Sequence, residues 1–202
     1  IRKAGYQNGI QLMLGLPGDT SRRALETAQA VIQLKPDLVR IYPTLVISGS
    51  ALAASFSAGR YSPMSLKAAV AMSSSLLRLF RQHHIRVIRL GLQAADGLED
   101  PTMVLAGPYH PAFGHLVYSA IYHEAAQALL NGVSPLPQKP VLRVHPHHLS
   151  RLQGLGKQNL DLLRHHFERP LLAFETTADL PLGQLACGDR QMSVWSLPPA
   201  ET

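Results

Sequence analysis

Two stretches decide the fold: LMLGLPGDT at residues 12–20 and VRIYPTLV at residues 39–46. Each is a short apolar run that ends in a turn, and an amphipathic segment about one helix long lies between them. This order predicts a strand–helix–strand unit of a parallel sheet, with loops at the carboxyl ends of both strands. Proteins of the α/β class place cofactors and substrates at such ends, so a functional site is expected there.

The alternation of predicted strands and helices continues along the first half of the chain. Residues 9–16 and 38–42 are predicted strands, and residues 21–34 are a helix capped by Asp19 or Thr20. A short helix at 51–58, a long helix at 63–83 and a strand at 85–92 follow, and the segments 43–50 and 94–109 are predicted loops. Three strands separated by helical connections predict an α/β fold, either a β/α barrel or an open sheet.

The second half is predicted as a helical extension followed by a small α/β unit. Residues 115–130 read as a helix, and the prolines within residues 133–140 mark a linker. Beyond the linker we predict strands at 141–144, 171–174 and 191–195, and helices at 149–152 and 158–167. The predicted domains are therefore residues 1–106, 107–140 and 141–202.

The composition narrows the class of protein. No run of about 18 apolar residues occurs, so no contact with a membrane is expected, and the first residues do not resemble a signal peptide. The single cysteine, Cys187, excludes an internal disulfide and fits a reducing cytoplasm. The formal charge of +6 favours a phosphate-rich partner such as RNA. Because the chain begins with Ile1 and soon enters a strand, we expect a fragment whose upstream part is missing.

Several short motifs make the sequence resemble the radical S-adenosylmethionine (SAM) enzymes. GLPGDT at residues 15–20 is similar to a strand-end signature of the coproporphyrinogen oxidase branch and of the Elongator catalytic subunit branch. The second branch matches better, through YPTLV (42–46), SGS (48–50), GRY (59–61) and RVIR (86–89) in the same order. GPYHPAFG at residues 107–114 resembles bacterial relatives of that subunit that lack its acetyltransferase domain.

The resemblance implies a fold and a chemistry. The fold is the C-terminal part of a partial (β/α) barrel of the radical SAM type, followed by the small α/β unit. The parent protein is expected to use SAM, a 4Fe-4S cluster and an electron donor, to generate a 5′-deoxyadenosyl radical, and to act on RNA or tRNA. The cluster requires three cysteines spaced Cys-x-x-x-Cys-x-x-Cys. Cys187 alone cannot build it, so the ligands are expected upstream of Ile1.

Four residues are implied by the resemblance to contact the cofactor. Gln11 stands where relatives often carry an acidic ligand of the ribose, and it can still hydrogen-bond a hydroxyl. Met13 and Leu45 are expected on opposite sides of the adenine, and Gly15 allows close backbone approach at the turn. A second interpretation places Met13 and Leu45 in the barrel core and Gly15 in a turn that binds no ligand.

Five residues are candidates for contacting the substrate. Tyr42 and Thr44 follow the second strand, and Arg89 lies on the third, where a guanidinium can hold a carboxylate or a phosphate. Tyr109 and His110 lie in a loop that is expected to close over the mouth of the barrel. The alternatives are a surface position for Arg89 and a loop that only seals the open edge of the barrel.

The last unit is locally basic and offers a different function. GLGK at residues 154–157 faintly resembles the turn by which a KH module holds RNA, so Lys157 and Arg164 are candidate nucleic-acid contacts. The alternative function is therefore a non-catalytic nucleic-acid-binding module on a barrel scaffold. The histidines at 145, 147, 148, 165 and 166 match no closed ligand pattern, so no metal site is predicted. No catalytic residue is identified.

Overall fold

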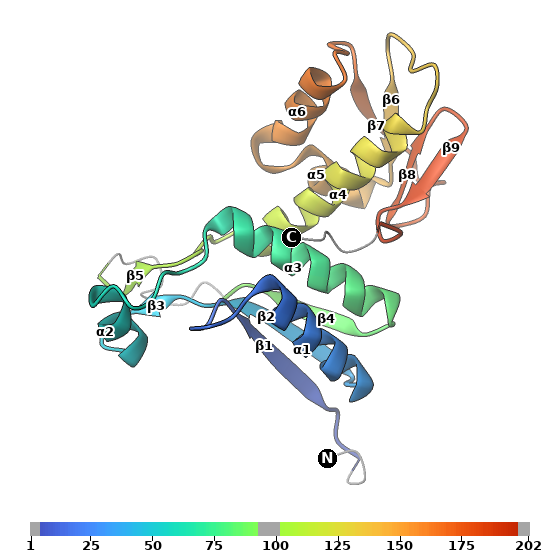
Figure 1. The fold of residues 1–202 in the computed structure, drawn as a ribbon. Coiled ribbons are helices and arrows are strands. Elements are labelled where there is room, and N and C mark those ends of the chain that lie inside the picture. The colour runs from blue at the N-terminus through green and yellow to red at the C-terminus, as the bar shows by residue number, and fades with distance from the viewer. Residues whose placement is uncertain (1–4, 93–101, 198–202) are drawn as a thin grey trace. The chain divides into compact units, whose positions relative to one another are not determined.

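The computed structural model describes residues 5–92 and 102–197. They form two compact units, one within the first 114 residues and one over residues 115–198. Figure 1 shows the order of the elements along the chain. The three domains predicted from the sequence stay a prediction beside this division.

A three-stranded parallel sheet forms the centre of the first unit. Its strands are β1 (Gly9–Leu14), β2 (Leu38–Pro43) and β4 (Arg86–Leu90), in the order β1-β2-β4. The helices α1 (Ser21–Gln33) and α3 (Leu66–Gln82) pack against one side of it (Figure 1). The predicted α/β class and the strand–helix–strand order are confirmed, and within the described residues the sheet stays open.

The helices of the first unit begin where the sequence supplies a hydroxyl. Thr20, Ser50 and Ser65 each accept a hydrogen bond from the backbone N–H three residues further on. These bonds satisfy donors that have no partner inside the first turn of a helix. They start α1, the short helix α2 (Ala51–Ser57) and α3, and Thr20 rather than Asp19 is the cap of α1.

The core of the first unit lies between the sheet and its two helices. Alternate residues of β1 and β2 point into it, because successive side chains of a strand face opposite ways. Its buried members are Leu12, Leu14, Ala24, Ala28, Val31, Ile32, Val39, Ile41, Met72, Leu76, Phe80 and, just before β4, Ile85. The residues between them on the strands therefore lie on the face that α1 and α3 leave open.

Two short strands occupy segments that the sequence predicts as loops. β3 (Val46–Ile47) pairs antiparallel with β5 (Val104–Ala106), so the loop predictions are wrong there. Strands this short show no periodicity, and only pairing between segments far apart in the chain defines them. Residues 94–101 of the predicted loop at 94–109 lie outside the described residues.

The second unit holds most of the long helix α4 (Phe113–Asn131) and a four-stranded sheet. The sheet order is β7-β6-β8-β9, from β6 (Val141–Val144), β7 (Ala173–Thr176), β8 (Gln184–Cys187) and β9 (Arg190–Ser193). Only the β6–β7 pair is parallel. The prediction missed β8, a four-residue strand defined by its pairing with β6 and β9.

Short helical segments complete the second unit. They are η2 (Pro146–His148), α5 (Leu149–Gln153), η3 (Leu155–Lys157) and α6 (Gln158–His166). No helix among the described residues combines the length and the apolar character needed to cross a bilayer.

Candidate functional site

Polar side chains gather on the open face of the first sheet, opposite α1 and α3. The strand register pairs Gln11 with Arg40 and Arg40 with Arg89, and it pairs Met13 with Tyr42 two residues nearer the carboxyl ends. Register partners in a parallel sheet share a face. The structure thus brings four of the predicted site residues onto one face, and it adds Arg40.

The position of Arg89 depends on a bulge in β4. Val87 and Leu90 both pack against the buried core, although regular alternation would put them on opposite faces. The register shifts between Val39 and Arg40, so that Arg40 pairs with Arg89. Arg89 consequently points to the same face as Arg40, as expected of a bulge, which re-aims side chains.

Arg40 is not among the site residues predicted from the sequence, although the alternation of residues in β2 indicates it. Strands of a parallel sheet that are buried on both faces read as continuous apolar runs. In β2 an arginine stands between Val39 and Ile41, which are both fully buried. This alternation indicates a strand with one face that the helices do not cover.

A groove runs along the unpaired edge of β1. It has a volume of about 540 Å³ and lies between this edge and α1, with Gln11, Met13 and Leu16 on one side and Arg23, Thr27 and Val31 of α1 on the other. Met13 is 40% exposed, and the Gln11 Nε2 group donates to the Met13 sulfur over 3.6 Å. A flexible thioether beside an amide suits a ligand that combines a flat ring with hydroxyl groups. Leu45 is buried, and its place on the other side of the adenine stays a prediction.

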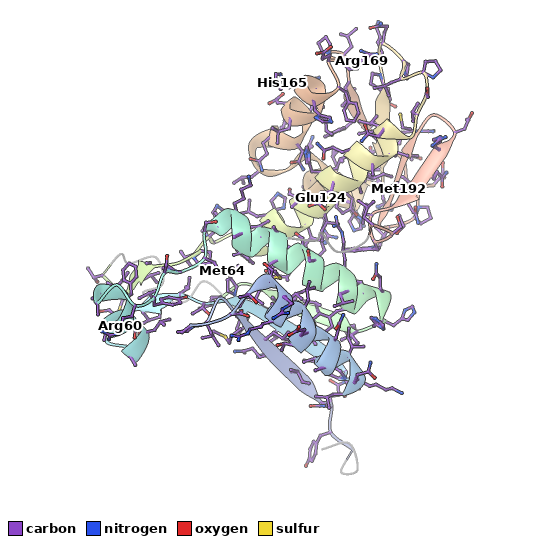
Figure 2. All side chains as sticks on the ribbon, viewed as in Figure 1. Arg60, Met64, Glu124, His165, Arg169 and Met192 are labelled. Atoms are coloured by element: carbon purple, nitrogen blue, oxygen red, sulfur yellow. The ribbon has the colours of Figure 1, made fainter. Side chains whose placement is uncertain are left out.

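The turn at Gly15 is held by the protein itself. Gly15 has φ +78°, its N–H donates to Asp19 Oδ2 over 2.8 Å, and its carbonyl accepts from the Tyr61 hydroxyl over 2.5 Å. Burial raises the pKa of Tyr61, which keeps this donor protonated. A Cβ at Gly15 would lie 2.7 Å from the side chain of Met64, labelled in Figure 2. Gly15 thus has a structural role, and its contact with a cofactor stays a prediction.

The segment that carries Tyr109 and His110 lies against the end of β2. Gly107, with φ +117°, approaches so closely that a Cβ there would be 3.0 Å from the carbonyl oxygen of Thr44. His110 Nδ1 accepts the N–H of Ala112 over 3.0 Å, so a neutral ring carries its proton on Nε2. A small cavity between these segments is lined by Pro43, Leu45, Gly91, Leu92, Pro108, Tyr109, His110 and Phe113.

Two buried hydroxyls at this end of the sheet lack a hydrogen-bond partner among the described residues. They are Thr44 Oγ1 and the phenolic oxygen of Tyr109. Leaving a buried hydroxyl unpaired costs about 1–3 kcal/mol, so these two atoms are candidate positions for a hydrogen bond to a bound group. Both residues were predicted from the sequence to contact substrate, and that contact stays a prediction.

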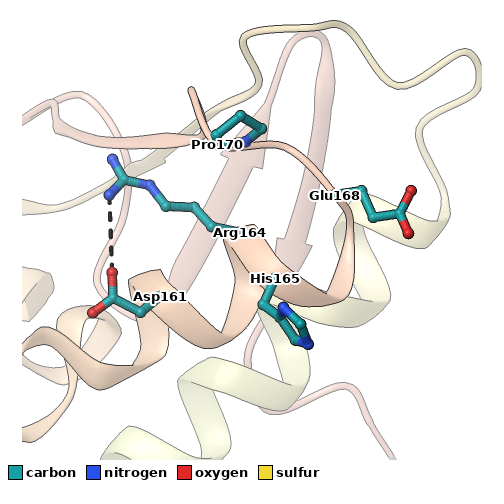
Figure 3. A pocket seen from close by; sticks show the side chains of 5 residues that line it. All are labelled: Asp161, Arg164, His165, Glu168 and Pro170. Atoms are coloured by element: carbon teal, nitrogen blue, oxygen red, sulfur yellow. Dashed lines mark ion pairs between the residues drawn. The ribbon is translucent and has the colours of Figure 1, made fainter.

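The candidate nucleic-acid contacts of the second unit have different surroundings. Arg164 Nε donates to the carbonyl of Leu172 over 2.9 Å, and its Nη1 lies 3.9 Å from Asp161 Oδ1. Arg164 extends toward Asp161 across a surface hollow of about 710 Å³, and Glu168 points away from both (Figure 3). Lys157 is exposed on η3. The Nε of Arg164 is thus bound within the protein, and its exposed terminal nitrogens lie near one carboxylate.

A histidine in the second unit is surrounded by hydrogen-bond donors. Nδ1 of His148 lies 2.6 Å from the Tyr122 hydroxyl and accepts the N–H of Gly183 over 3.1 Å, while Arg151 Nη1 lies 3.1 Å from Nε2. A protonated ring accepts at neither nitrogen. Burial is the main cause that lowers the pKa of His148 to about 4, and the charges of Arg151, His145 and His147 lower it further. Burial raises the pKa of Tyr122 to about 12, so its hydroxyl remains protonated.

His148 makes the second unit sensitive to acid. Between pH about 6.5 and about 4 the unfolded chain protonates this ring and the folded chain does not, so the free energy of unfolding falls as the pH falls. Allowing for its partial exposure, we expect a loss of about 1–2 kcal/mol. Urea unfolding at pH about 7 and about 4.5, followed by the fluorescence of the single tryptophan, Trp195, measures it.

Two variants isolate this contribution. His148→Asn is expected to flatten the dependence of unfolding on pH, whereas His165→Asn, at an exposed position on α6, is expected to leave it intact. An equal loss of stability in acid for the His148→Asn variant and the unchanged chain would show that other groups cause it.

An iron–sulfur cluster does not fit the residues of this chain. Cys187 is the single cysteine, it is buried on β8, and burial raises the pKa of its thiol. Cluster ligation requires several clustered thiolates. Across residues 5–92 and 102–197, no group of three or more His, Cys, Asp or Glu side chains could hold a metal ion.

Comparison with known proteins supplies the context of this site. Residues 36–123 match the family model of the radical SAM C-terminal domain. Among solved structures, the chain is similar to Elp3 of the archaeon Methanocaldococcus infernus with residues 1–46 deleted, at a TM-score of 0.54 and 22% sequence identity. The likeness covers 70% of this chain and 35% of that protein. No curated protein matches the sequence. The predicted fold, the C-terminal part of a radical SAM-type partial barrel followed by a smaller α/β unit, is thereby confirmed.

Proposed function

We propose that the chain is the C-terminal portion of a radical SAM enzyme related to the Elongator catalytic subunit, a proposal supported by the match of residues 36–123 to the family model of the radical SAM C-terminal domain. In this proposal the first unit supplies one wall of the SAM pocket and part of the substrate mouth. The chain spans 35% of the length of the archaeal protein to which it is similar.

The observation that carries the proposal is the grouping on the open face of the sheet. Gln11, Met13, Tyr42 and Arg89 come from three strands and lie on one face, next to a groove along the free edge of β1. A β/α barrel binds its ligands at the carboxyl ends of its parallel strands, and Met13 and Tyr42 stand one residue before these ends. The unpaired hydroxyls of Thr44 and Tyr109 support a ligand at the same end of the sheet.

The chain's own residues bind and orient in this proposal. When bound, SAM and its cluster supply the radical chemistry, and the thiolates that hold the cluster come from the part of the parent that precedes this chain. Gln11 hydrogen-bonds a ribose hydroxyl, Met13 packs on the adenine, and Tyr42 faces the substrate. The positive charge of the chain supports RNA or tRNA as the substrate class.

Reductive cleavage of SAM tests the proposal. The parent protein, reconstituted with iron and sulfide and given SAM and a reductant, is expected to release 5′-deoxyadenosine. A preparation without cluster serves as the blank. Product no higher than this blank contradicts the enzymatic function and favours a non-catalytic binding module.

A matched pair of variants tests the pocket. Met13 and Met103 are similarly exposed, at 40% and 44%. Met13→Asp puts a carboxylate against the proposed adenine position and is expected to raise the KM for SAM about tenfold. Met103→Asp is expected to leave the KM unchanged. Equal KM values for the two variants would remove Met13 from the pocket.

A further inference from the structure

Three arginines stand on the open face of the first sheet with no acidic residue in the same strands. Arg40 pairs with Arg89, and Arg86 pairs with Leu38, which lies two residues before Arg40 and so shares its face. The strands β1, β2 and β4 contain no Asp or Glu. The face therefore carries three positive charges that the sheet itself does not neutralise.

Two of these guanidinium groups lie within reach of one ligand. Neighbouring strands lie about 4.8 Å apart, and Arg40 and Arg89 are direct register partners across them. Within the described residues, neither makes an ion pair or a side-chain hydrogen bond. Like charges placed directly opposite each other destabilise a sheet, and an anion bound between them removes this repulsion.

We propose that Arg40 and Arg89 form a phosphate-binding site, with Arg86 as a third contact toward the amino end of β4. The planar fork of arginine matches the oxygens of a phosphate, which it binds through two parallel hydrogen bonds. The amide of Gln11 is a further donor in the same row. The inference deepens the proposed function and rests on it for the substrate class, a nucleotide or RNA.

The aromatic neighbour of this row favours a phosphate that belongs to a nucleotide. Tyr42 lies two residues beyond Arg40 on β2 and shares its face. Its partly buried ring stands nearer the carboxyl end of the strand. Surfaces that bind single-stranded nucleic acid combine basic groups for the backbone with aromatic rings for the bases, and this face offers both.

The distribution of charge favours this face over the second unit. Residues 1–114 contain twelve Lys and Arg against six Asp and Glu, whereas residues 141–202 contain six of each, so the description of the last unit as basic holds for short stretches and not for the unit as a whole. The excess of positive charge thus lies in the first 114 residues, which include the sheet of β1, β2 and β4. Arg164 of the second unit is already engaged by Leu172 and Asp161.

Binding of phosphate probes to the 202-residue chain tests the site. The probes are a short single-stranded RNA and inorganic pyrophosphate, with acetate as a carboxylate control. We expect each of Arg40→Gln and Arg89→Gln to weaken RNA binding about tenfold, since one charge-assisted contact is lost. The slope of log affinity against log salt is expected to become shallower by about 0.7 for each arginine removed.

Three further variants locate the effect and guard against misfolding. Arg60→Gln removes an exposed arginine of the same unit, labelled in Figure 2, and is expected to leave binding unchanged. The double variant Lys157→Gln/Arg164→Gln tests the second unit and is expected to bind as the unchanged chain does. Arg89→Lys keeps the charge without the fork and is expected to restore part of the affinity. The midpoint of thermal unfolding is measured for each variant, and an unchanged midpoint shows that the variant folds.

The outcomes separate the inference from the proposed function. Parallel loss of RNA and pyrophosphate binding supports a site for a single phosphate, and loss of RNA binding alone supports contact with a longer backbone. Unchanged RNA binding in the Arg40→Gln and Arg89→Gln variants overturns the site. So does a loss of RNA binding in the Lys157→Gln/Arg164→Gln variant, or acetate that binds as tightly as pyrophosphate. These results stand whether or not the parent protein releases 5′-deoxyadenosine, which tests the function alone.

Discussion

Replacing Leu76 with alanine is expected to lower the free energy of unfolding of the first unit by about 3–5 kcal/mol. Leu76 lies on α3 with no exposed surface, within the core that joins this helix to β1 and β2. The change removes buried methyl groups and leaves a cavity that the close-packed surroundings fill only in part. Urea unfolding followed by circular dichroism measures the loss.

Leu34→Ala is the matched control for this prediction. Leu34, at the C-terminal cap of α1 in the same unit, is 61% exposed, so its truncation is expected to cost less than about 0.5 kcal/mol. The Leu76→Ala variant is also expected to lose RNA binding, because the core fixes the register that pairs Arg40 with Arg89. A loss of stability no larger than that of Leu34→Ala would contradict the packing described for α3.

Replacing Asn159 with alanine is expected to destabilise the second unit by about 2–3 kcal/mol. The amide of Asn159 is buried and donates two hydrogen bonds of 3.0 Å, to the carbonyl oxygens of Ser119 on α4 and Leu152 on α5. It thereby ties three helices together at one point. Alanine leaves both carbonyls without this donor, in a region that water does not reach. Urea unfolding followed by Trp195 fluorescence reports the effect.

Two further variants separate hydrogen bonding from packing at this position. Asn159→Asp keeps the shape but places a carboxylate against two carbonyl oxygens, so it is expected to destabilise at least as much as alanine. Gln158→Ala changes the exposed neighbour and is expected to be neutral within about 0.5 kcal/mol. A stable Asn159→Asp variant would show that the donated bonds contribute little.

The elements that the sequence predicts well are those with local signals. The first two strands follow from short apolar runs that end in turns, and the helix between them follows from its amphipathic pattern and the hydroxyl of Thr20 before it. The long helix α3 begins at Leu66 after the Ser65 cap, three residues later than predicted. β3 and β5, of two and three residues, escaped prediction because segments this short show no periodicity, and β8 escaped although β6, which has the same length, was predicted. Their stability lies in tertiary contacts rather than in local propensity.

The candidate site also has a part that the sequence predicts and a part that depends on tertiary structure. Gln11 and Met13 are predicted through the resemblance to the radical SAM enzymes, and Tyr42 through its position at the carboxyl end of the second strand. The pairing of Arg40 with Arg89 could not be predicted, because it depends on a bulge in β4 that shifts the register by one residue. The surroundings of Arg164, held by Leu172 and Asp161, likewise depend on tertiary structure that no spacing in the sequence reveals.

The structure of the parent protein with SAM bound tests the central claim most directly. The account predicts that the adenine contacts Met13, that the ribose lies within hydrogen-bond distance of Gln11, and that both lie on the face of the sheet opposite α1 and α3. SAM bound away from this face, with Gln11 and Met13 covered by other parts of the protein, would contradict the account.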